Sequence, residues 1–207
     1  MKKKISATIL ACTMLCNVAL VHAQDVNFER IGQLKIILGD TNGNWNLEKL
    51  ITKAELMQFA INGLNLKSAT AYGNYFSDMD GHWAKNTANL AVDLKLAEKS
   101  DKFLPESNVT NAEAVKTVVK ILGYEPMAKS MGGELFSYIT VASQIGLTKD
   151  LTFVADNMAS REFVATLMTN ALTIPVMQQT GYGKHEEYKV ADGKDGSIKT
   201  TLESLFE

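Results

Sequence analysis

Ile51-Thr52-Lys53-Ala54-Glu55 recurs in this chain as Val109-Thr110-Asn111-Ala112-Glu113, and a weaker third copy reads Ala159-Ser160-Arg161-Glu162-Phe163. In each copy an aromatic residue stands seven positions before the hydroxyl residue, and a leucine stands twelve positions after it. The aromatic residues are Trp45, Phe103 and Phe153, and the leucines are Leu64, Leu122 and Leu172. A frame shared over this length predicts three internal repeats.

The motif itself predicts the start of a helix. Thr52 with Glu55, and Thr110 with Glu113, have the spacing of a capping box, in which hydroxyl and carboxylate satisfy backbone N–H groups of the first turn. Apolar residues four, eight and twelve positions after the hydroxyl form one helical stripe. Each copy therefore predicts an amphipathic helix of about three to four turns. In the third copy Phe163 replaces the glutamate, so only the hydroxyl half remains.

An earlier helix precedes the motif in each copy. Apolar stripes predict these helices around residues 28–38, 83–97 and 139–145, with loops at 39–46, 98–108 and 146–157. The aromatic residue of the frame lies in or next to each loop, where its burial would contribute about 2–3 kcal/mol. Because one helix pair cannot bury its own apolar face, we expect three pairs around a shared core. The fold class is therefore mainly α.

Four stretches resemble the S-layer homology (SLH) family. Phe76-Ser77-Asp78-Met79-Asp80-Gly81-His82-Trp83-Ala84 is similar to its "FSDV…HWA" opening, and residues 51–55 and 109–113 are similar to its "ITRAE". Residues 39–45 resemble its "GDPDGNF" loop. The resemblance covers roughly residues 26–175. It implies helix-loop-helix repeats at 26–66, 74–125 and 127–175, arranged as a three-pronged spindle around a central helical bundle and followed by a tail at 176–207.

The resemblance also implies a function, which is non-covalent, non-catalytic attachment to a secondary cell-wall polysaccharide that typically carries pyruvate ketals. The family's ligand contacts include the tryptophan of "HWA" and the arginine of "TRAE". Matching positions here are Trp83 for the tryptophan, and Lys53, Asn111 and Arg161 for the arginine. A guanidinium meets a carboxylate through two parallel hydrogen bonds, and an indole suits the apolar face of a sugar.

This chain departs from the family pattern at several positions. Lys53 keeps the charge of the arginine without its fork, and Asn111 keeps neither. The first copy lacks the "FSD…HWA" opening. The second has Lys95 and Glu98 where glycine is usual, and its loop is shorter by about two residues than the resemblance implies. The fold is therefore expected to persist while some ligand-binding grooves are degenerate.

Several of these residues have a second interpretation. Arg161 and Lys53 are either ligand contacts or solvated residues of a first helical turn. Trp83 is either a sugar contact or a half-buried packing residue. Asp78 either orients a groove or caps the helix that begins near Trp83, and the cap is favoured. Trp45 is expected in the core, by its equivalence to Phe103 and Phe153.

The N-terminus has the three parts of a secretory signal peptide at residues 1–23: Lys2 to Lys4, an apolar stretch to Leu20, and the cleavage sequence Val21-His22-Ala23. Cys12 and Cys16 both lie within it, so the mature chain from Gln24 has no thiol and no disulfide. Removing three lysines leaves 18 basic against 23 acidic residues, a net charge of −5. That balance argues against nucleic acid as a partner. We expect a secreted protein at the cell wall or surface layer, with no membrane span after cleavage.

Motifs for catalysis and metal binding are absent from the sequence. Asp40, Asn42, Asn44 and Asn46 resemble the start of a calcium loop, but Trp45 and Ile51 occupy positions that need glycine and an acid, so a turn rich in Asn and Gly is favoured. No catalytic residue, metal or cofactor is expected. A surface hydrolase would need paired carboxylates that nothing singles out. The main alternative is a degenerate SLH scaffold that serves a surface-protein partner without binding sugar. Residues after about Tyr182 are expected to be poorly ordered or loosely docked.

Overall fold

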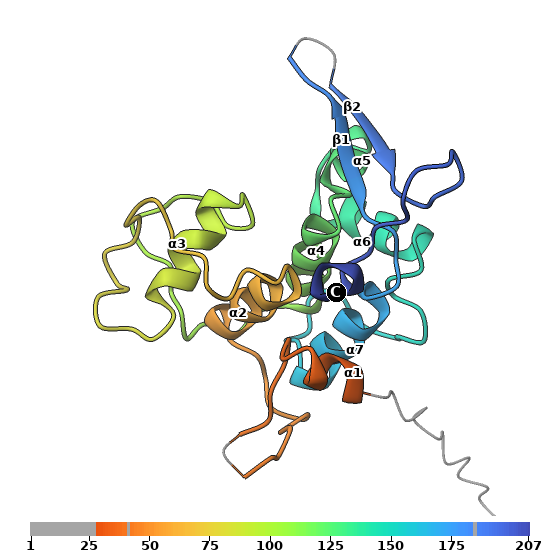
Figure 1. Cartoon of the computed structure of the whole chain (residues 1–207). Coiled ribbons are helices and arrows are strands. Elements are labelled where there is room, and N and C mark those ends of the chain that lie inside the picture. The colour runs from red at the N-terminus through yellow and green to blue at the C-terminus, as the bar shows by residue number, and fades with distance from the viewer. Residues whose placement is uncertain (1–27, 41, 184–185) are drawn as a thin grey trace, which may run out of the picture.

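The computed structural model describes residues 28–40, 42–183 and 186–207 (Figure 1). The predicted signal peptide, its cleavage site and both cysteines lie outside them. The described chain is mainly helical, as expected, with seven α-helices, one short 3-10 helix and a two-stranded hairpin. No helix of these residues is long and apolar enough to span a bilayer. The elements are α1 Glu29–Gln33, α2 Lys53–Gly63, α3 Lys85–Asp93, α4 Asn111–Ile121, α5 Glu125–Ser130, α6 Leu135–Gln144, α7 Arg161–Ala171, β1 Met177–Gly181, β2 Glu187–Val190 and the 3-10 helix Glu203–Phe206.

The three predicted motif helices are present as α2, α4 and α7, each eleven residues long. Their N-caps are Thr52, Thr110 and Ser160, and each hydroxyl accepts a hydrogen bond from the third residue of its helix. The capping boxes of α2 and α4 are complete, because the glutamate carboxylate also accepts from the N–H of the cap. Such a cap contributes about 1 kcal/mol, so the local sequence fixes where these helices begin.

The earlier helices are present as α1, α3 and α6. Helices α1 and α3 end four or five residues before the apolar stripes do, whereas α6 ends within one residue of its stripe and begins four residues earlier. Each is followed by a left-handed residue, Lys35 at φ 56°, Lys95 at φ 60° or Gly146 at φ 79°. The left-handed turn reverses the chain and brings the next apolar residues back onto the helix. Ile37 is therefore fully buried after the turn, rather than on a longer α1. From the left-handed residue to the helix cap, the chain spans 17 positions in the first copy, 15 in the second and 14 in the third.

A closed ring of backbone hydrogen bonds joins the three motifs. The N–H of Ile51 donates to the carbonyl oxygen of Ala159 (3.0 Å), that of Ala159 to Val109 (2.8 Å), and that of Val109 to Ile51 (3.3 Å). All three residues are buried. Because each copy donates to one neighbour and accepts from the other, the motifs are related by an approximate threefold symmetry.

A second set of three backbone hydrogen bonds follows the same cyclic pattern. In each motif helix, the N–H of the first residue donates to the carbonyl of the residue three positions before the N-cap of the neighbouring copy, at 2.8 Å in every case. These bonds are Lys53 to Ser107, Asn111 to Asn157, and Arg161 to Lys49. Each motif helix thus begins against the loop that precedes the neighbouring motif. This arrangement places the candidate ligand residues at the seams between copies.

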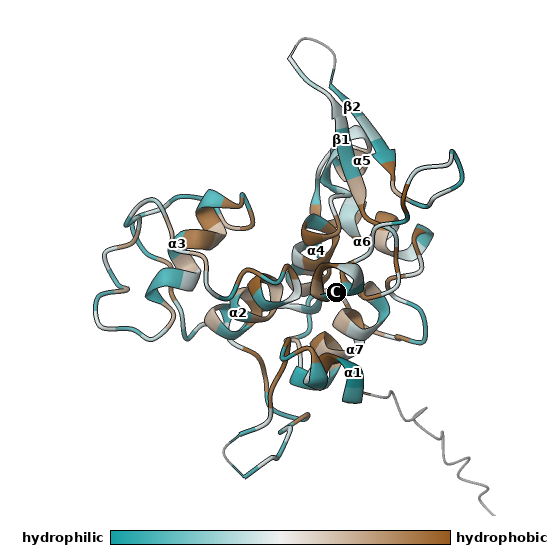
Figure 2. Ribbon diagram, in the orientation of Figure 1, coloured by the Kyte–Doolittle hydropathy of each residue, from teal (hydrophilic) through white to brown (hydrophobic). Residues whose placement is uncertain are grey.

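The core lies where α2, α4 and α7 meet, and all three helices contribute buried apolar residues to it. Figure 2 shows hydrophobic residues within α2 and α4. Among the loop aromatics, Phe103 is fully buried and its ring centroid lies 5.1 Å from that of Phe76. Trp45 is half-buried, packs against the core and lies 6.1 Å from Phe28. Phe153 contacts Phe163 at 5.1 Å. Phe103 is therefore buried in the core, whereas Trp45, which was expected there, and Phe153 are only partly buried against it.

The C-terminal segment differs from expectation. Strands β1 and β2 form an antiparallel hairpin where the sequence suggests a linker, and in Figure 1 it projects beside α5. The prediction of a loosely docked tail is wrong, because Leu202 is fully buried and the N–H of Glu203 donates to the carbonyl of Leu172 (3.2 Å). Glu203 also forms an ion pair with Arg30. The tail therefore packs on the helices instead of extending from them.

Candidate functional site

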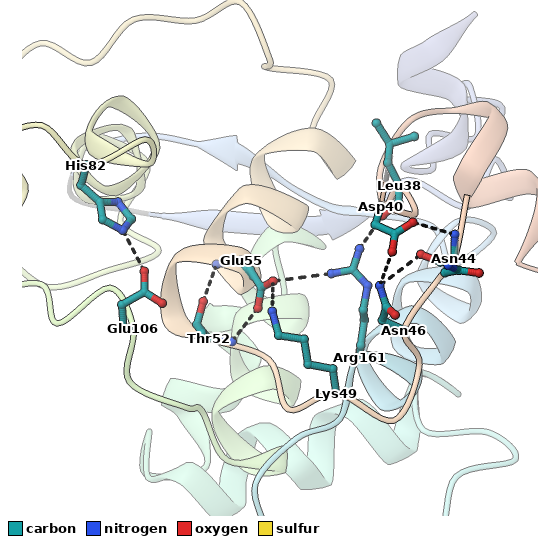
Figure 3. A network of polar contacts seen from close by, with 10 residues as sticks. All are labelled: Leu38, Asp40, Asn44, Asn46, Lys49, Thr52, Glu55, His82, Glu106 and Arg161. Carbon is teal, nitrogen blue, oxygen red and sulfur yellow. Dashed lines mark hydrogen bonds and ion pairs between the residues drawn. The ribbon is translucent and has the colours of Figure 1, made fainter. Parts of the chain in front are cut away.

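Groove A lies at the seam between the third and first copies. It is a cleft of about 210 Å³ between the start of α7 and the loop that follows α1 (Figure 3). Its lining residues are Leu38, Gly39, Asp40, Asn46, Lys49, Glu55 and Arg161. The ring of backbone bonds positions Arg161 here, because its N–H is held by the carbonyl of Lys49.

Arg161 is held on several sides in groove A. One terminal nitrogen donates to the carbonyl of Leu38, and the other lies 3.8 Å from Oε1 of Glu55. The guanidinium lies 4.9 Å from the ring centroid of Phe59, and the side chain is only 12% exposed. Burial lowers the pKa of Arg161, and the nearby Glu55 carboxylate opposes that shift. Arg161 is thus a fixed, partly covered cation, not a freely solvated residue of a first turn.

Glu55 links the two cations of groove A. Its Oε1 lies 3.2 Å from Nζ of Lys49, and its Oε2 accepts from the N–H of Thr52 at 3.0 Å (Figure 3). The same carboxylate therefore caps α2 and orients Arg161 and Lys49.

The carboxylate of Asp40 holds together the loop that lines groove A through hydrogen bonds within the loop. Its carboxylate accepts from the N–H groups of Asn44 (3.0 Å) and Asn42 (2.8 Å) and from the side-chain amide of Asn46 (3.2 Å). These donors, led by the N–H of Asn44, lower the pKa of Asp40. The favoured turn rich in Asn and Gly is confirmed. Within residues 28–40, 42–183 and 186–207, no three His, Cys, Asp or Glu side chains gather as metal ligands.

Groove B lies at the equivalent seam between the first and second copies, where Lys53 takes the place of Arg161. It is larger, about 460 Å³, and is bordered by the loop after α3 and the start of α4. Nζ of Lys53 lies 4.7 Å from the ring centroid of Phe103, and a second ammonium group comes from Lys116. Glu98 and Glu113 also line the groove. Grooves A and B therefore share the combination of two cations and two carboxylates.

The third seam, between the second and third copies, has lost both charges. Asn111 takes the place of Arg161, and Phe163 takes the place of Glu55. Asn111 is 7% exposed, and its amide donates to the carbonyl of Val154 at 3.0 Å. The Phe163 ring packs on Phe153. The two losses, separate in the sequence, therefore fall on one seam.

Asp78 fixes the loop beside groove B. Its two carboxylate oxygens accept from the N–H groups of Phe103 and Leu104, both at 2.8 Å. Burial alone would raise the pKa of Asp78, but these N–H donors outweigh it and the pKa is lowered. The favoured helix cap is wrong: α3 has Ala84 as its N-cap, and the N–H of Ala84 donates to Nδ1 of His82. Asp78 instead positions the loop.

Trp83 is not among the residues that line groove A or groove B. Its side chain is 61% exposed, which does not support the half-buried packing interpretation. The indole lies 5.5 Å from the ring of His82, whose Nε2 is 2.9 Å from Glu106 (Figure 3). The structure therefore brings Arg161, Lys53 and Asn111 to equivalent seams. Asp78 holds the loop beside groove B, and Trp83 is exposed and lines neither groove.

The sequence did not reveal the groove roles of Glu55, Lys49 and Leu104. Glu55 is recognised from sequence only as a helix cap, and Lys49 and Leu104 belong to no motif. A signal exists in the shared frame, because Lys49 and Leu104 stand three and six positions before a cap. That spacing becomes informative only once the cyclic pairing of the copies is known.

Comparisons with known proteins give distant similarity. The chain is 28% identical over 167 residues to the middle cell wall protein of Brevibacillus brevis and 26% identical over 179 residues to the surface layer protein of Brevibacillus choshinensis. These matches cover 76% and 82% of the chain. The cell surface protein of Thermoanaerobacter kivui is 26% identical over 156 residues, 72% of the chain. No family model matches.

The chain is a distant relative of surface-layer and cell-wall proteins. It spans 16% of the length of the first two relatives and 20% of the third. The similarity therefore concerns a small part of each of those proteins, and it agrees in kind with the SLH-like motifs.

Proposed function

We propose that this chain is a non-catalytic cell-surface anchoring module that binds an acidic secondary cell-wall polysaccharide in grooves A and B. One observation carries the proposal: at both seams a cation from one copy faces the loop and capping glutamate of the next. The three-pronged SLH spindle is the fold that goes with this function. The names of the relatives, which are wall and surface proteins, support the same location.

The chemistry of the grooves suits an acidic sugar better than a simple anion. A ligand carboxylate, such as that of a pyruvate ketal, would accept from Arg161 or Lys53. The hydroxyl groups of the same sugar would donate to the groove carboxylates, Glu55 in groove A and Glu113 in groove B. Asn111 and Phe163 offer neither interaction, so we assign no ligand to the third seam.

A second candidate function is a scaffold that serves a surface-protein partner and has lost sugar binding. The observation in its favour is that Arg161 already donates to the carbonyl of Leu38 and pairs with Glu55. The side-chain amide of Asn111 likewise donates across the third seam to the carbonyl of Val154. In this alternative these side chains only hold neighbouring copies together.

The test is sedimentation of the purified 24–207 chain with Brevibacillus brevis sacculi, before and after chemical removal of the secondary polymer. We expect binding that requires the polymer and weakens about tenfold for Arg161→Ala, since a charge-assisted pair is lost. Arg30→Ala is the matched control, because Arg30 forms an exposed ion pair with Glu203 away from both grooves. A folded chain that does not bind would favour the scaffold. Sugar release that stops on one carboxylate substitution would show a hydrolase.

A further inference from the structure

The tail that follows the three copies contains a pocket of its own, which we call the hairpin pocket. Its volume is about 390 Å³, and pockets for small molecules range over about 300–1,000 Å³. One wall is the face of the hairpin that carries Gln178, Thr180 and Lys189. The other wall is the loop that follows β2, which Figure 1 shows beside the hairpin. None of its lining residues lines groove A or groove B.

The hairpin wall is shaped by the geometry of β1. Gln178 and Thr180 are exposed, whereas the residues that alternate with them are half-buried. Thr180 has no partner in the ladder, because the register shifts between Gln179 and Gly181. Such a β-bulge re-aims a side chain and is frequent beside binding sites. The polar side chains of this wall therefore lie on the face opposite to the half-buried one.

The loop wall is held in one shape by short-range hydrogen bonds. The carboxylates of Asp192 and Asp195 accept from the N–H groups of Lys194 and Ser197, each two positions later and both at 3.1 Å. The N–H of Thr200 donates to the carbonyl of the residue after β2 at 3.0 Å and closes the base of the loop. The hairpin pocket is therefore preformed, which lowers the entropic cost of binding a ligand.

The hairpin pocket contains a cation and an anion that do not pair with each other. Among the described residues, Lys189 forms no ion pair, and the side chains of Gln178 and Thr180 make no hydrogen bond. Hydrogen bonds from Ser197, together with the nearby ammonium group of Lys189, lower the pKa of Asp195. The carboxylate is therefore ionised, and both charges remain available to a ligand.

An aliphatic surface adjoins these charges. Ile198 lines the pocket and is 87% exposed, more than any other large aliphatic side chain of the described residues. It lies on the fixed loop, so its exposure is not that of a frayed chain end. Val190, which is 38% exposed, lines the same pocket from the end of β2.

We propose that the hairpin pocket binds a short zwitterionic peptide with an aliphatic side chain. The carboxylate of the peptide pairs with Lys189, its ammonium group pairs with Asp195, and its side chain packs on Ile198 and Val190. Gln178 is the cross-strand partner of Lys189, and its amide both donates to and accepts from the peptide bond. A neutral sugar would leave both charges unused, and a simple anion would be repelled by Asp195.

The experiment titrates the ¹⁵N-labelled 24–207 chain and follows the chemical shifts of its backbone amides. The three ligands are alanyl-leucine, its N-acetyl derivative, which lacks the ammonium group, and its C-terminal amide, which lacks the carboxylate. The two test variants are Lys189→Gln and Asp195→Asn, and asparagine keeps the turn because its side-chain oxygen accepts the same N–H. Asp192→Asn is the matched control, since Asp192 makes the same kind of turn in the same loop and does not line the pocket.

We expect alanyl-leucine to shift the amides of the pocket, and each blocked derivative to bind about fivefold more weakly, since one partly exposed charge pair is lost. Lys189→Gln should weaken the binding of alanyl-leucine about fivefold and bind it no better than its amide, while still discriminating against the N-acetyl derivative. Asp195→Asn should show the reverse pattern, and Asp192→Asn should behave as the wild type. A loop that had merely lost its shape would not exchange one selectivity for the other.

Three results would overturn the inference. These are pocket amides that do not shift at about 20 mM peptide, well above a millimolar Kd, shifts confined to grooves A and B, and equal binding of the three ligands. The inference does not rest on the proposed function. Sacculus binding is measured separately and depends on other residues, so either conclusion can fail while the other stands.

Discussion

The guanidinium of Arg161 lies 3.8 Å from the carboxylate of Glu55, which joins the start of α7 to the start of α2. Arg161 follows its own cap by one position, and Glu55 follows its cap by three. The pair thus forms only because the third copy returns to the first and closes the ring. Glu55 therefore does more than cap its own helix: it also pairs with Arg161 across the seam between the third and first copies, and it lines groove A.

Glu55→Gln should destabilise the fold more than Glu113→Gln. Glutamine still completes a capping box, so both variants keep the cap. Glu55 also pairs with Arg161 and Lys49, whereas the structure gives Glu113 no ion pair among the described residues. We expect a difference of about 1 kcal/mol in unfolding free energy, since the pair with Arg161 is largely buried. Urea denaturation measures it. A double-mutant cycle with Arg161→Ala that showed no coupling would contradict the pairing.

Asp78 makes the loop beside groove B sensitive to acid. Its pKa is lowered in the folded chain, so its contribution to stability is complete above the unfolded value near 3.8 and is lost as pH falls through the folded value. Asp78→Asn keeps the shape but removes the charged acceptor, at a cost of about 2 kcal/mol at pH 7. We expect that cost to stay constant above about pH 5 and to shrink below pH 4.

Measuring unfolding free energy against pH for both chains checks this prediction. Asp80→Asn is the control, because Asp80 is exposed and pairs with Lys85 at the surface. A difference between wild type and Asp78→Asn that persisted unchanged at pH 2 would show that the carboxylate charge is not what holds the loop.

Alanine substitutions at Gly123 and Gly146 distinguish the cost of backbone strain from the cost of a steric clash. Both have positive φ, 82° and 79°, so alanine at either position should cost about 1 kcal/mol. A Cβ on Gly123 would also collide with the backbone carbonyl of Met177, while one on Gly146 meets nothing within 4 Å. We expect Gly123→Ala to cost about 2 kcal/mol more than Gly146→Ala, measured by urea denaturation. Equal costs would mean that β1 does not lie against the end of α4.

The parts of the fold that the sequence predicted are those set by local rules. Hydroxyl caps, apolar periodicity and loop aromatics located α2, α4 and α7, because each signal acts within one turn or one helix. The early end of α1 escaped prediction because Lys35, a residue with no turn preference, takes the left-handed position. The pairing of Arg161 with Glu55 needed ring closure, which spans more than a hundred positions.

The tail escaped prediction for a related reason. Its buried residues, Ala191 and Leu202, stand eleven positions apart among polar residues and show no periodicity. Nothing local distinguishes Leu202 from Leu205, yet Leu202 is fully buried and Leu205 is 40% exposed. Only contacts with distant segments make that difference: Glu203 bonds to Leu172 and pairs with Arg30, and the carbonyl of Leu205 accepts from Asn65.

Leu202→Ala should therefore destabilise the whole chain, whereas Leu205→Ala should not. Removing a fully buried leucine costs about 3 kcal/mol, and removing a half-exposed one costs well under half of that. Urea denaturation compares the two, and amide exchange locates the effect. In the wild type the N–H groups of Glu203 and Met177 should exchange slowly, since they donate to the carbonyls of Leu172 and Leu122. If both variants unfolded like the wild type and these amides exchanged at once, the tail would be a loose extension. A loss of stability confined to Leu202→Ala means that the last residues pack on the helices and stabilise them.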